Sequence, residues 1–168
     1  MLGKLSPARR ISNKTYNGER ALHVRAPSRP PLRKPDMTTA RYFDTGELIS
    51  LAHQSSRIDT PCSCQKSQLA GWSTQPLSLP DAQLHDIGTL AEMDPEAASY
   101  EEYLPEGTQY ASDNAPIAPR YFPYNRCAVS ECVICKRCFL RYTEGGGYFV
   151  DKRIRQLDPD VIVDVALP

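Results

Sequence analysis

The chain has 168 residues, a formal net charge of zero and 40% hydrophobic residues, which is close to the usage of globular proteins. No apolar run approaches the ~18 residues that a membrane-spanning helix needs, which excludes an integral helical membrane protein. Six cysteines are too few for a dense disulfide scaffold, and no secretory signal follows Met1. We therefore expect reduced thiols and a cytoplasmic location.

The zero net charge conceals a strongly basic N-terminal segment, residues 1–36. Nine Lys and Arg residues outnumber two acids there, and five prolines interrupt the segment. Such a composition cannot bury enough apolar surface to offset the loss of chain entropy, so we expect a disordered basic arm and then one domain over 37–168. Four interpretations of the arm stay open: polyanion binding, a targeting role, an inert tail, or a true start at Met37 instead of Met1.

The first half of the domain is predicted to contain a hairpin and two short helices. Aromatic and branched residues on both sides of Asp44–Gly46 predict a hairpin turn. Apolar residues spaced three apart predict a helix over 80–90, and Asp94 followed by proline predicts the start of another. Trp72, the only tryptophan, is expected to anchor the core.

A second hairpin is predicted near the C-terminus. Phe139–Thr143 and Tyr148–Val150 have the composition of its two strands, and Glu144–Gly147 that of its turn. One or two helical turns over 151–157 and a last short strand over 161–163 are predicted to follow. The predicted fold class is therefore α+β, a small domain of short hairpins and a few short helices.

The cysteines are clustered, which argues against their use as small buried apolar residues. Cys132 and Cys135 form a C-x2-C pair, in which a tight turn can direct both thiolates toward one cation. Lys136 and Arg137 would offset part of the negative charge of such a site. The six cysteines are Cys62, Cys64, Cys127, Cys132, Cys135 and Cys138.

The segment Cys132–Arg137 and the predicted hairpin that follows it resemble the zinc knuckle and hairpin of zinc-ribbon and treble-clef modules, over residues 127–150. The resemblance implies a structural zinc held by four ligands. No second C-x2-C pair follows at the spacing of a zinc ribbon, so two further ligands must come from elsewhere in the chain.

We favour Cys62 and Cys64 as the additional ligands, because one intervening residue still lets two thiolates reach one ion from a loop. A metal site made of Cys62, Cys64, Cys132 and Cys135 would staple the two halves of the domain. It would close a loop of roughly seventy residues, where a crosslink restricts the unfolded chain most. The domain is therefore predicted to be zinc-stapled.

A local ligand set stays open as the alternative, with Cys127 and Cys138 joining the C-x2-C pair. Cys138 adjoins the strand predicted from Phe139, and a strand conformation would direct its side chain away from the knuckle. Cys127, His53 or His85 could also replace one member of the favoured set.

The favoured function is non-enzymatic. A zinc ion held by four thiolates has no open position for water and is therefore structural. No H-E-x-x-H, P-loop, G-x-S-x-G or G-x-G-x-x-G motif occurs in the sequence. We predict a module that is stabilised by Zn²⁺ and binds a protein partner.

Three other hypotheses stay open. An iron–sulfur or thiol redox protein would use the cysteines between Cys127 and Cys138, and a zinc hydrolase would need a three-cysteine or mixed site. A nucleic-acid binder would use a basic cluster on and after the knuckle hairpin. Its members are Lys136, Arg137, Arg141, Lys152, Arg153 and Arg155.

Overall fold

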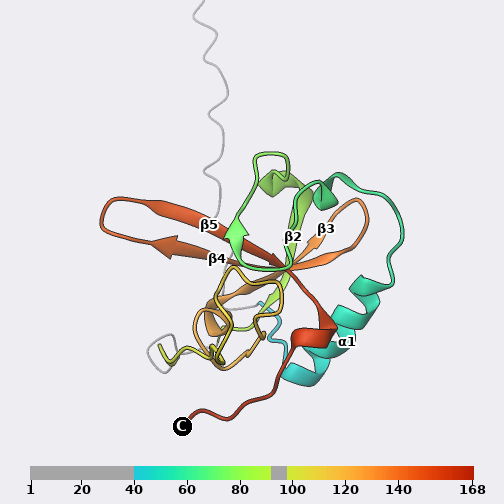
Figure 1. Ribbon diagram of the computed structural model, residues 1–168. Coiled ribbons are helices and arrows are strands. Elements are labelled where there is room, and N and C mark those ends of the chain that lie inside the picture. Colours follow the sequence, from blue (N-terminus) through green and yellow to red (C-terminus); the bar gives the residue numbers. More distant parts are fainter. Residues whose placement is uncertain (1–39, 92–97) are drawn as a thin grey trace, which may run out of the picture. The chain divides into compact units, whose positions relative to one another are not determined.

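The computed structural model describes residues 40–91 and 98–168, which contain one α-helix and a five-stranded antiparallel sheet (Figure 1). The helix is α1 (Thr45–Ser56), and the strands run in the order β1-β5-β4-β3-β2. Their bounds are Ser73–Thr74 for β1, Leu84–Thr89 for β2, Ala128–Cys132 for β3, Cys138–Gly145 for β4 and Val150–Gln156 for β5. Single 3-10 turns are η2 (Ser63–Gln65), η3 (Asp81–Gln83), η4 (Tyr124–Arg126) and η5 (Pro159–Val161).

These elements confirm the prediction of a small mixed α and β domain. The predicted basic arm and the choice between Met1 and Met37 concern residues outside the described ranges. The helix predicted from Asp94 also begins outside them, and residues 98–103, which are described, form no helix. No helix in the described part of the chain is long and apolar enough to cross a membrane.

The hairpin predicted around Asp44–Gly46 is wrong, because this segment starts α1. The Asp44 side chain accepts a hydrogen bond from the backbone N–H of Glu47 at 2.8 Å, and the Glu47 side chain accepts one from the backbone N–H of Asp44. This reciprocal capping box satisfies two N–H groups that the first helical turn leaves unpaired. Leu48 and Ala52 then lie buried on the inner face of the helix.

The helix predicted over 80–90 is also wrong, since this segment forms η3 and then β2. Leu84 pairs with Cys132 at one end of the β2–β3 ladder, and Thr89 pairs with Ala128 at the other. A bulge between Asp86 and Gly88 shifts the register. A bulge interrupts the strict alternation of a strand, which explains why the apolar spacing imitated a helix.

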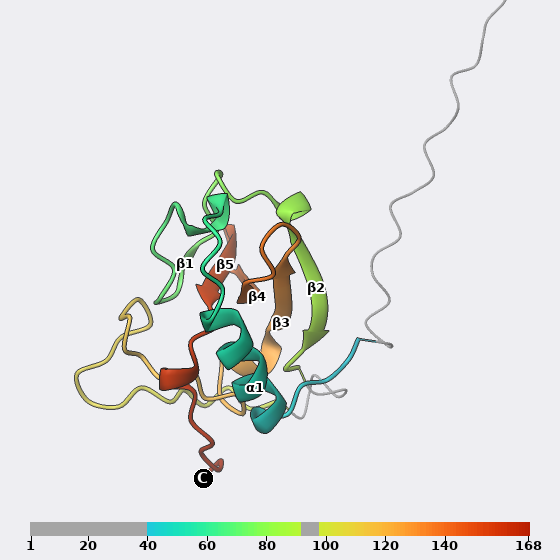
Figure 2. The same cartoon turned by 90° about the vertical axis from the view of Figure 1, so that its right-hand side faces the viewer.

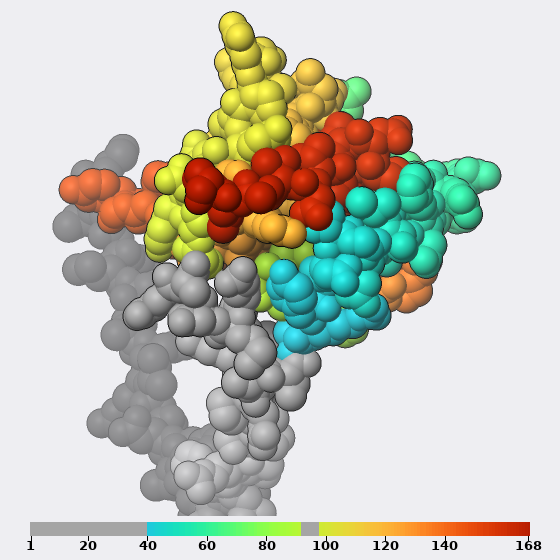
Figure 3. Space-filling view, turned by 90° about the horizontal axis from the view of Figure 1, so that it is seen from below, coloured from blue at the N-terminus to red at the C-terminus, as the bar shows by residue number. Residues whose placement is uncertain are grey.

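A C-terminal hairpin forms as predicted, but its turn is shifted to residues 146–149. Tyr148 and Phe149, which were predicted to begin the second strand, lie in this turn, and β5 begins at Val150. β4 and β5 pair from Phe139↔Gln156 to Gly145↔Val150, so the helical turns predicted over 151–157 are wrong. The predicted strand over 161–163 is reduced to a single parallel bridge between Ile162 and Ile117. In Figure 3 the C-terminal segment, in red, lies across the surface between α1 and the segment around residues 100–110.

Two clusters of buried side chains hold the described residues together. α1 lies against one face of the sheet (Figure 2), and the cluster there contains Leu48, Trp72 and Leu140. We call this the helix-side cluster, and it confirms the expected burial of Trp72, which is 5% exposed. The second contains Cys64, Cys132, Cys135, Phe139 and Ile154 among others, and we call it the cysteine-side cluster. Because side chains alternate along a strand, Phe139 and Leu140 of β4 enter different clusters.

Candidate metal centre

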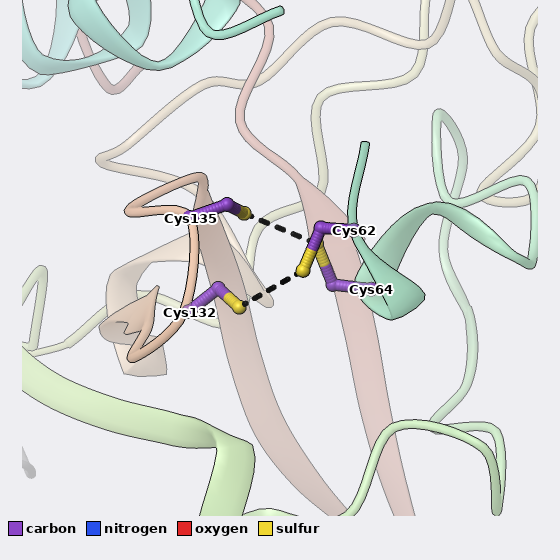
Figure 4. A group of neighbouring side chains, drawn as sticks. All are labelled: Cys62, Cys64, Cys132 and Cys135. Carbon is purple, nitrogen blue, oxygen red and sulfur yellow. Dashed lines mark hydrogen bonds between the residues drawn. The ribbon is translucent and has the colours of Figure 1, made fainter. Parts of the chain in front are cut away.

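Two of the six cysteines lie on a single turn of 3-10 helix after α1. Cys62 is the residue before η2 and Cys64 is its second residue. The backbone N–H of Gln65 donates to the carbonyl oxygen of Cys62 at 3.1 Å, which closes the turn. This tight turn lets two thiols separated by one residue point to the same side of the loop (Figure 4).

Two more cysteines lie on the turn between β3 and β4. Cys132 ends β3, and Cys135 lies within the turn. The backbone N–H of Lys136 donates to the carbonyl of Cys132 at 2.9 Å, and the backbone N–H of Cys132 donates to the carbonyl of Arg137 at 2.8 Å. Lys136 has a φ of 70°, a left-handed backbone conformation that residues other than glycine adopt at a cost in free energy. The turn therefore folds tightly enough to aim both sulfurs in one direction.

The structure brings these two cysteine pairs together (Figure 4). The Sγ atoms of Cys62 and Cys132 are 3.7 Å apart, and those of Cys64 and Cys135 are 3.5 Å apart. All four sulfurs lie within 4.8 Å of one another. Four sulfurs placed tetrahedrally at ~2.3 Å from a zinc ion would be about 3.8 Å from each other. The arrangement thus has the dimensions of a single-ion tetrathiolate site.

The same distances show that the cysteines are not crosslinked to one another. A disulfide has an S–S distance of ~2.05 Å, and all six cysteines are free. Cys64, Cys132 and Cys135 are buried, whereas Cys62 is half-buried. Three buried thiols and one half-buried thiol leave little room for a solvent molecule to join the group.

Hydrogen bonds at the turn between β3 and β4 favour the thiolate form of Cys132. Burial raises the pKa of Cys132, but N–H groups around the sulfur outweigh this effect and lower the pKa to about 6. The donors are the backbone of Cys135 and Ile134 and the side chain of Gln83, whose Nε2 lies 3.4 Å from the sulfur. Burial, followed by the neighbouring Cys135 thiol, raises the pKa of Cys64. A cation would have to displace the proton from that thiol.

Gln83 connects the two cysteine pairs and was not identified from the sequence. Its Nε2 lies 3.7 Å from Sγ of Cys62 as well as near Cys132, and it donates to Oγ of Ser63 at 2.9 Å. Its backbone carbonyl accepts from the N–H of Val133. Nothing in the sequence distinguishes this glutamine, because its role comes from η3 approaching the knuckle in space.

Arg137 provides a buried positive charge beside the cysteines. Its side chain donates to Sγ of Cys135 at 3.5 Å, to the carbonyl of Thr60 at 2.8 Å and to the carbonyl of Ile58. The residue is only 3% exposed, and its guanidinium forms no ion pair with a carboxylate in residues 40–91 and 98–168. A divalent ion on four thiolates would carry a net negative charge and would therefore place a counter-charge beside this guanidinium.

The alternative ligands lie elsewhere. Cys127 and Cys138 belong to the helix-side cluster, and burial raises the pKa of both, that of Cys138 to about 11. His53 on α1 and His85 on β2 are exposed and are not part of the group of cysteines. The local set is therefore not assembled in this structure.

The basic cluster proposed for nucleic-acid binding is not a continuous exposed surface. Arg137 is 3% exposed and Arg155 is fully buried, where it donates to the Tyr124 hydroxyl and to the carbonyls of Ala70 and Ala115. The expectation that these two arginines are available to phosphates is wrong, because both are used inside the domain. The other four members form ion pairs with acids of the same chain.

Comparisons of this chain with models of protein families, with curated proteins and with solved structures find no match. The chemistry of the site must therefore be inferred from its own geometry. Four cysteines from two turns can hold one metal ion, and with four ligands in place no coordination position stays open for a reacting water molecule.

Proposed function

We propose that this chain is a non-enzymatic zinc-binding protein, in which one structural Zn²⁺ on four cysteines supports a protein-interaction module. The ligands in this proposal are Cys62, Cys64, Cys132 and Cys135. The observation that carries it is the spacing of their sulfurs, all within 4.8 Å. Soft thiolates in a tetrahedral set select zinc or iron, and reduced thiols of this kind fit a cytoplasmic location.

The metal would act by stabilising the fold. The cysteine-side cluster contains five buried apolar side chains other than cysteine, which is a thin core for the face it supports. An ion bound there would tie the loop after α1 to the β3–β4 turn. The unfolded chain has no preformed site, so the free energy of metal binding would add to the stability of the folded domain.

A protein partner is favoured over a nucleic acid by the charges near the knuckle. Binding to phosphates needs free cations that release counterions. Here Lys136 pairs with Glu131 at 2.7 Å, and Arg141 pairs with Asp86 at 2.6 Å. Exposed apolar side chains, by contrast, are present on the turn between β3 and β4, where Ile134 is 64% exposed. Such residues are typical of protein interfaces when they are grouped.

An iron-based redox protein is the second candidate, because a tetrahedral set of four sulfurs also suits a single iron ion. The close spacing of the sulfurs fits one ion better than a cluster with several irons and bridging sulfides, which would hold the cysteines farther apart. The two metals differ in colour, since an iron tetrathiolate absorbs visible light and a zinc tetrathiolate does not.

The test is to purify the full chain under reducing, anaerobic conditions and to measure its metal content and absorption. The proposal predicts a colourless protein with one zinc per chain in native mass spectrometry. A coloured protein that contains iron would contradict the zinc proposal and support the iron-based redox protein instead. A chain that is folded and free of metal would contradict both.

A further inference from the structure

The distal half of the β4–β5 hairpin is the most exposed part of the sheet. Figure 1 shows it projecting beyond the other strands. Its tip carries three consecutive apolar residues, Tyr148, Phe149 and Val150, which are 104%, 57% and 75% exposed. The backbone N–H of Gly146 donates to the carbonyl of Phe149 at 2.9 Å, so the tip is a closed turn that presents these side chains. A run of exposed apolar residues on an ordered turn indicates an interaction surface.

One edge of this hairpin has no strand beside it. β3 pairs with β4 only as far as Arg141, which lies opposite Ala128. The rest of β4, Tyr142–Gly145, therefore has no paired strand on that side within the described ranges. An unpaired edge of this kind offers backbone N–H and C=O groups to another strand. An antiparallel pairing can be made by two identical strands related by a two-fold axis, because each then meets its own donors and acceptors.

A row of aromatic rings begins at the same edge. Tyr142 contacts Phe122, with ring centroids 6.2 Å apart, and Phe122 contacts Tyr100 at 6.1 Å. Tyr100 is 75% exposed. If two hairpins lie antiparallel, the tip of each one comes close to the part of the other hairpin that adjoins the rest of the sheet, where this row of aromatic rings lies. The tip and the row are both apolar and aromatic, so each could cover the other.

The charges of the hairpin favour this arrangement over binding to a polyanion or an anionic membrane. Arg153 pairs with Glu144 at 2.7 Å and with Asp151 at 3.2 Å. Lys152 pairs with Asp81, and Arg141 pairs with Asp81 and Asp86. Every charged side chain from Arg141 to Arg153 thus has an opposite partner, so the hairpins could meet without bringing unpaired like charges together.

We propose that the partner of this module is a second copy of the same chain, joined through the β4–β5 hairpins. The open edges of the two β4 strands pair antiparallel, and Tyr148 and Phe149 of each copy pack on the row of Tyr100, Phe122 and Tyr142 of the other. An aromatic side chain buries ~150–250 Å², so covering the exposed rings of both copies removes on the order of 1,000 Å² of surface, which is the area that a specific interface needs. This inference rests on the proposed function, because it identifies the protein partner.

The test is sedimentation equilibrium of the full chain over a range of concentrations. We expect a reversible dimer. The double variant Tyr148→Ser/Phe149→Ser should raise the dissociation constant roughly tenfold or more, and Tyr100→Ser, on the other half of the contact, should weaken the dimer in the same direction. Leu77→Ser is the matched control, since Leu77 is 101% exposed but lies outside the proposed contact. It should leave the dissociation constant within about twofold of the parent value.

Zinc content is measured on the same samples, so that the two proposals can fail separately. A monomer with one zinc per chain at every concentration would overturn the dimer alone, as would a dimer that the tip and row variants leave unchanged. Binding of the monomer to vesicles of phosphatidylcholine and phosphatidylserine, lost in the tip variant, would also overturn it and assign the tip to a membrane surface. A chain without zinc would overturn the proposed function.

Discussion

The two buried clusters of this domain use cysteine in two different ways. In the helix-side cluster, Cys127 and Cys138 are surrounded by apolar side chains and lie among larger core residues. In the cysteine-side cluster, Cys64, Cys132 and Cys135 are buried next to one another, with the half-buried Cys62 beside them. The difference teaches that clustering in sequence does not identify ligands, because Cys135 and Cys138 are only three residues apart and belong to different clusters.

The surroundings of the sulfurs explain this division. Cys127 is fully buried, and burial raises its pKa well above that of a free thiol. Cys132 is also buried, but the N–H groups of the knuckle and Gln83 lower its pKa to about 6. Burial also raises the pKa of Cys64 and Cys135, so the pKa by itself does not divide the cysteines. Their positions divide them, because the sulfurs of Cys62, Cys64, Cys132 and Cys135 lie within 4.8 Å of one another, whereas Cys127 and Cys138 lie among apolar side chains.

Serine substitutions test this separation with the largest expected effect. Cys132→Ser removes one of four proposed ligands, so zinc should fall from one per chain toward none and the free energy of unfolding should drop by more than about 3 kcal/mol. Cys138→Ser is the matched control, because it replaces an equally buried cysteine three residues from Cys135. It should keep its zinc and lose only about 1–2 kcal/mol. Metal content and urea unfolding measure both effects, and equal zinc loss in the two variants would contradict the division.

Thiol alkylation sharpens the same comparison without any substitution. With zinc bound, all six thiols should react slowly with iodoacetamide at neutral pH. After a chelator removes the metal, the cysteine-side cluster should loosen, so the four proposed ligands should be labelled before the other two cysteines, beginning with Cys132, whose pKa is about 6. Cys127 and Cys138 should stay protected while the helix-side cluster remains folded, because both are buried among its apolar side chains. Peptide mapping by mass spectrometry identifies the labelled residues. Early labelling of Cys127 would show that the two clusters are not independent.

Arg137 tests whether the cysteine-side cluster carries negative charge. Arg137→Met removes the donor to Cys135 and the tether to the carbonyls of Ile58 and Thr60. We expect zinc affinity to fall by roughly 10–100-fold, the range for residues that support metal ligands. Arg137→Lys, which keeps the charge, should recover part of this loss. Arg141→Met is the control, since Arg141 pairs with Asp81 and Asp86 away from the sulfurs. Competition with a chromophoric chelator measures the affinity, and equal effects at both arginines would contradict the role assigned to Arg137.

Lys136 gives the smallest expected effect. Its φ of 70° is readily adopted by glycine. Lys136→Gly should therefore stabilise the zinc-bound domain by about 0.5–1 kcal/mol, after allowing for the loss of the exposed ion pair with Glu131. Lys136→Ala loses the same ion pair without relieving the backbone, so it should be no more stable than the parent. Thermal unfolding in the presence of zinc distinguishes the two variants.

The sequence predicted best the parts of the domain that depend on local chemistry. The second hairpin was predicted because Glu144–Gly147 is a strong turn signal between two aromatic and branched segments, although the turn itself lies two residues later than predicted. The approach of the Cys62 loop to the Cys132 turn was expected because a knuckle needs two more ligands. That expectation came from chemistry and not from contact between the segments, since nothing in the sequence shows which loops meet.

One error came from a local signal that was overlooked: Gly46 was interpreted as a turn residue, although Asp44 and Glu47 carried the signature of a capping box and begin α1. The other errors arose where tertiary packing controls the pattern. β5 was missed because Arg155 looks like an exposed residue in the sequence, so the alternation of buried and exposed side chains along the strand could not be recognised. In the structure Arg155 is fully buried and donates to the carbonyls of Ala70 and Ala115. Gln83 and the buried position of Arg137 could not be predicted, because both depend on which loops lie beside the knuckle.

The most direct test of the account is X-ray absorption at the zinc edge on the purified full chain. Four sulfur neighbours at ~2.3 Å, with no nitrogen or oxygen neighbour, are predicted for a closed site on Cys62, Cys64, Cys132 and Cys135. Cys62→Ser should replace one of these sulfurs by a lighter neighbour or release the ion, whereas Cys127→Ser should leave the spectrum unchanged. A mixed set of neighbours in the parent chain, or four sulfurs that persist in Cys62→Ser and change in Cys127→Ser, would contradict the assignment of the two kinds of cysteine.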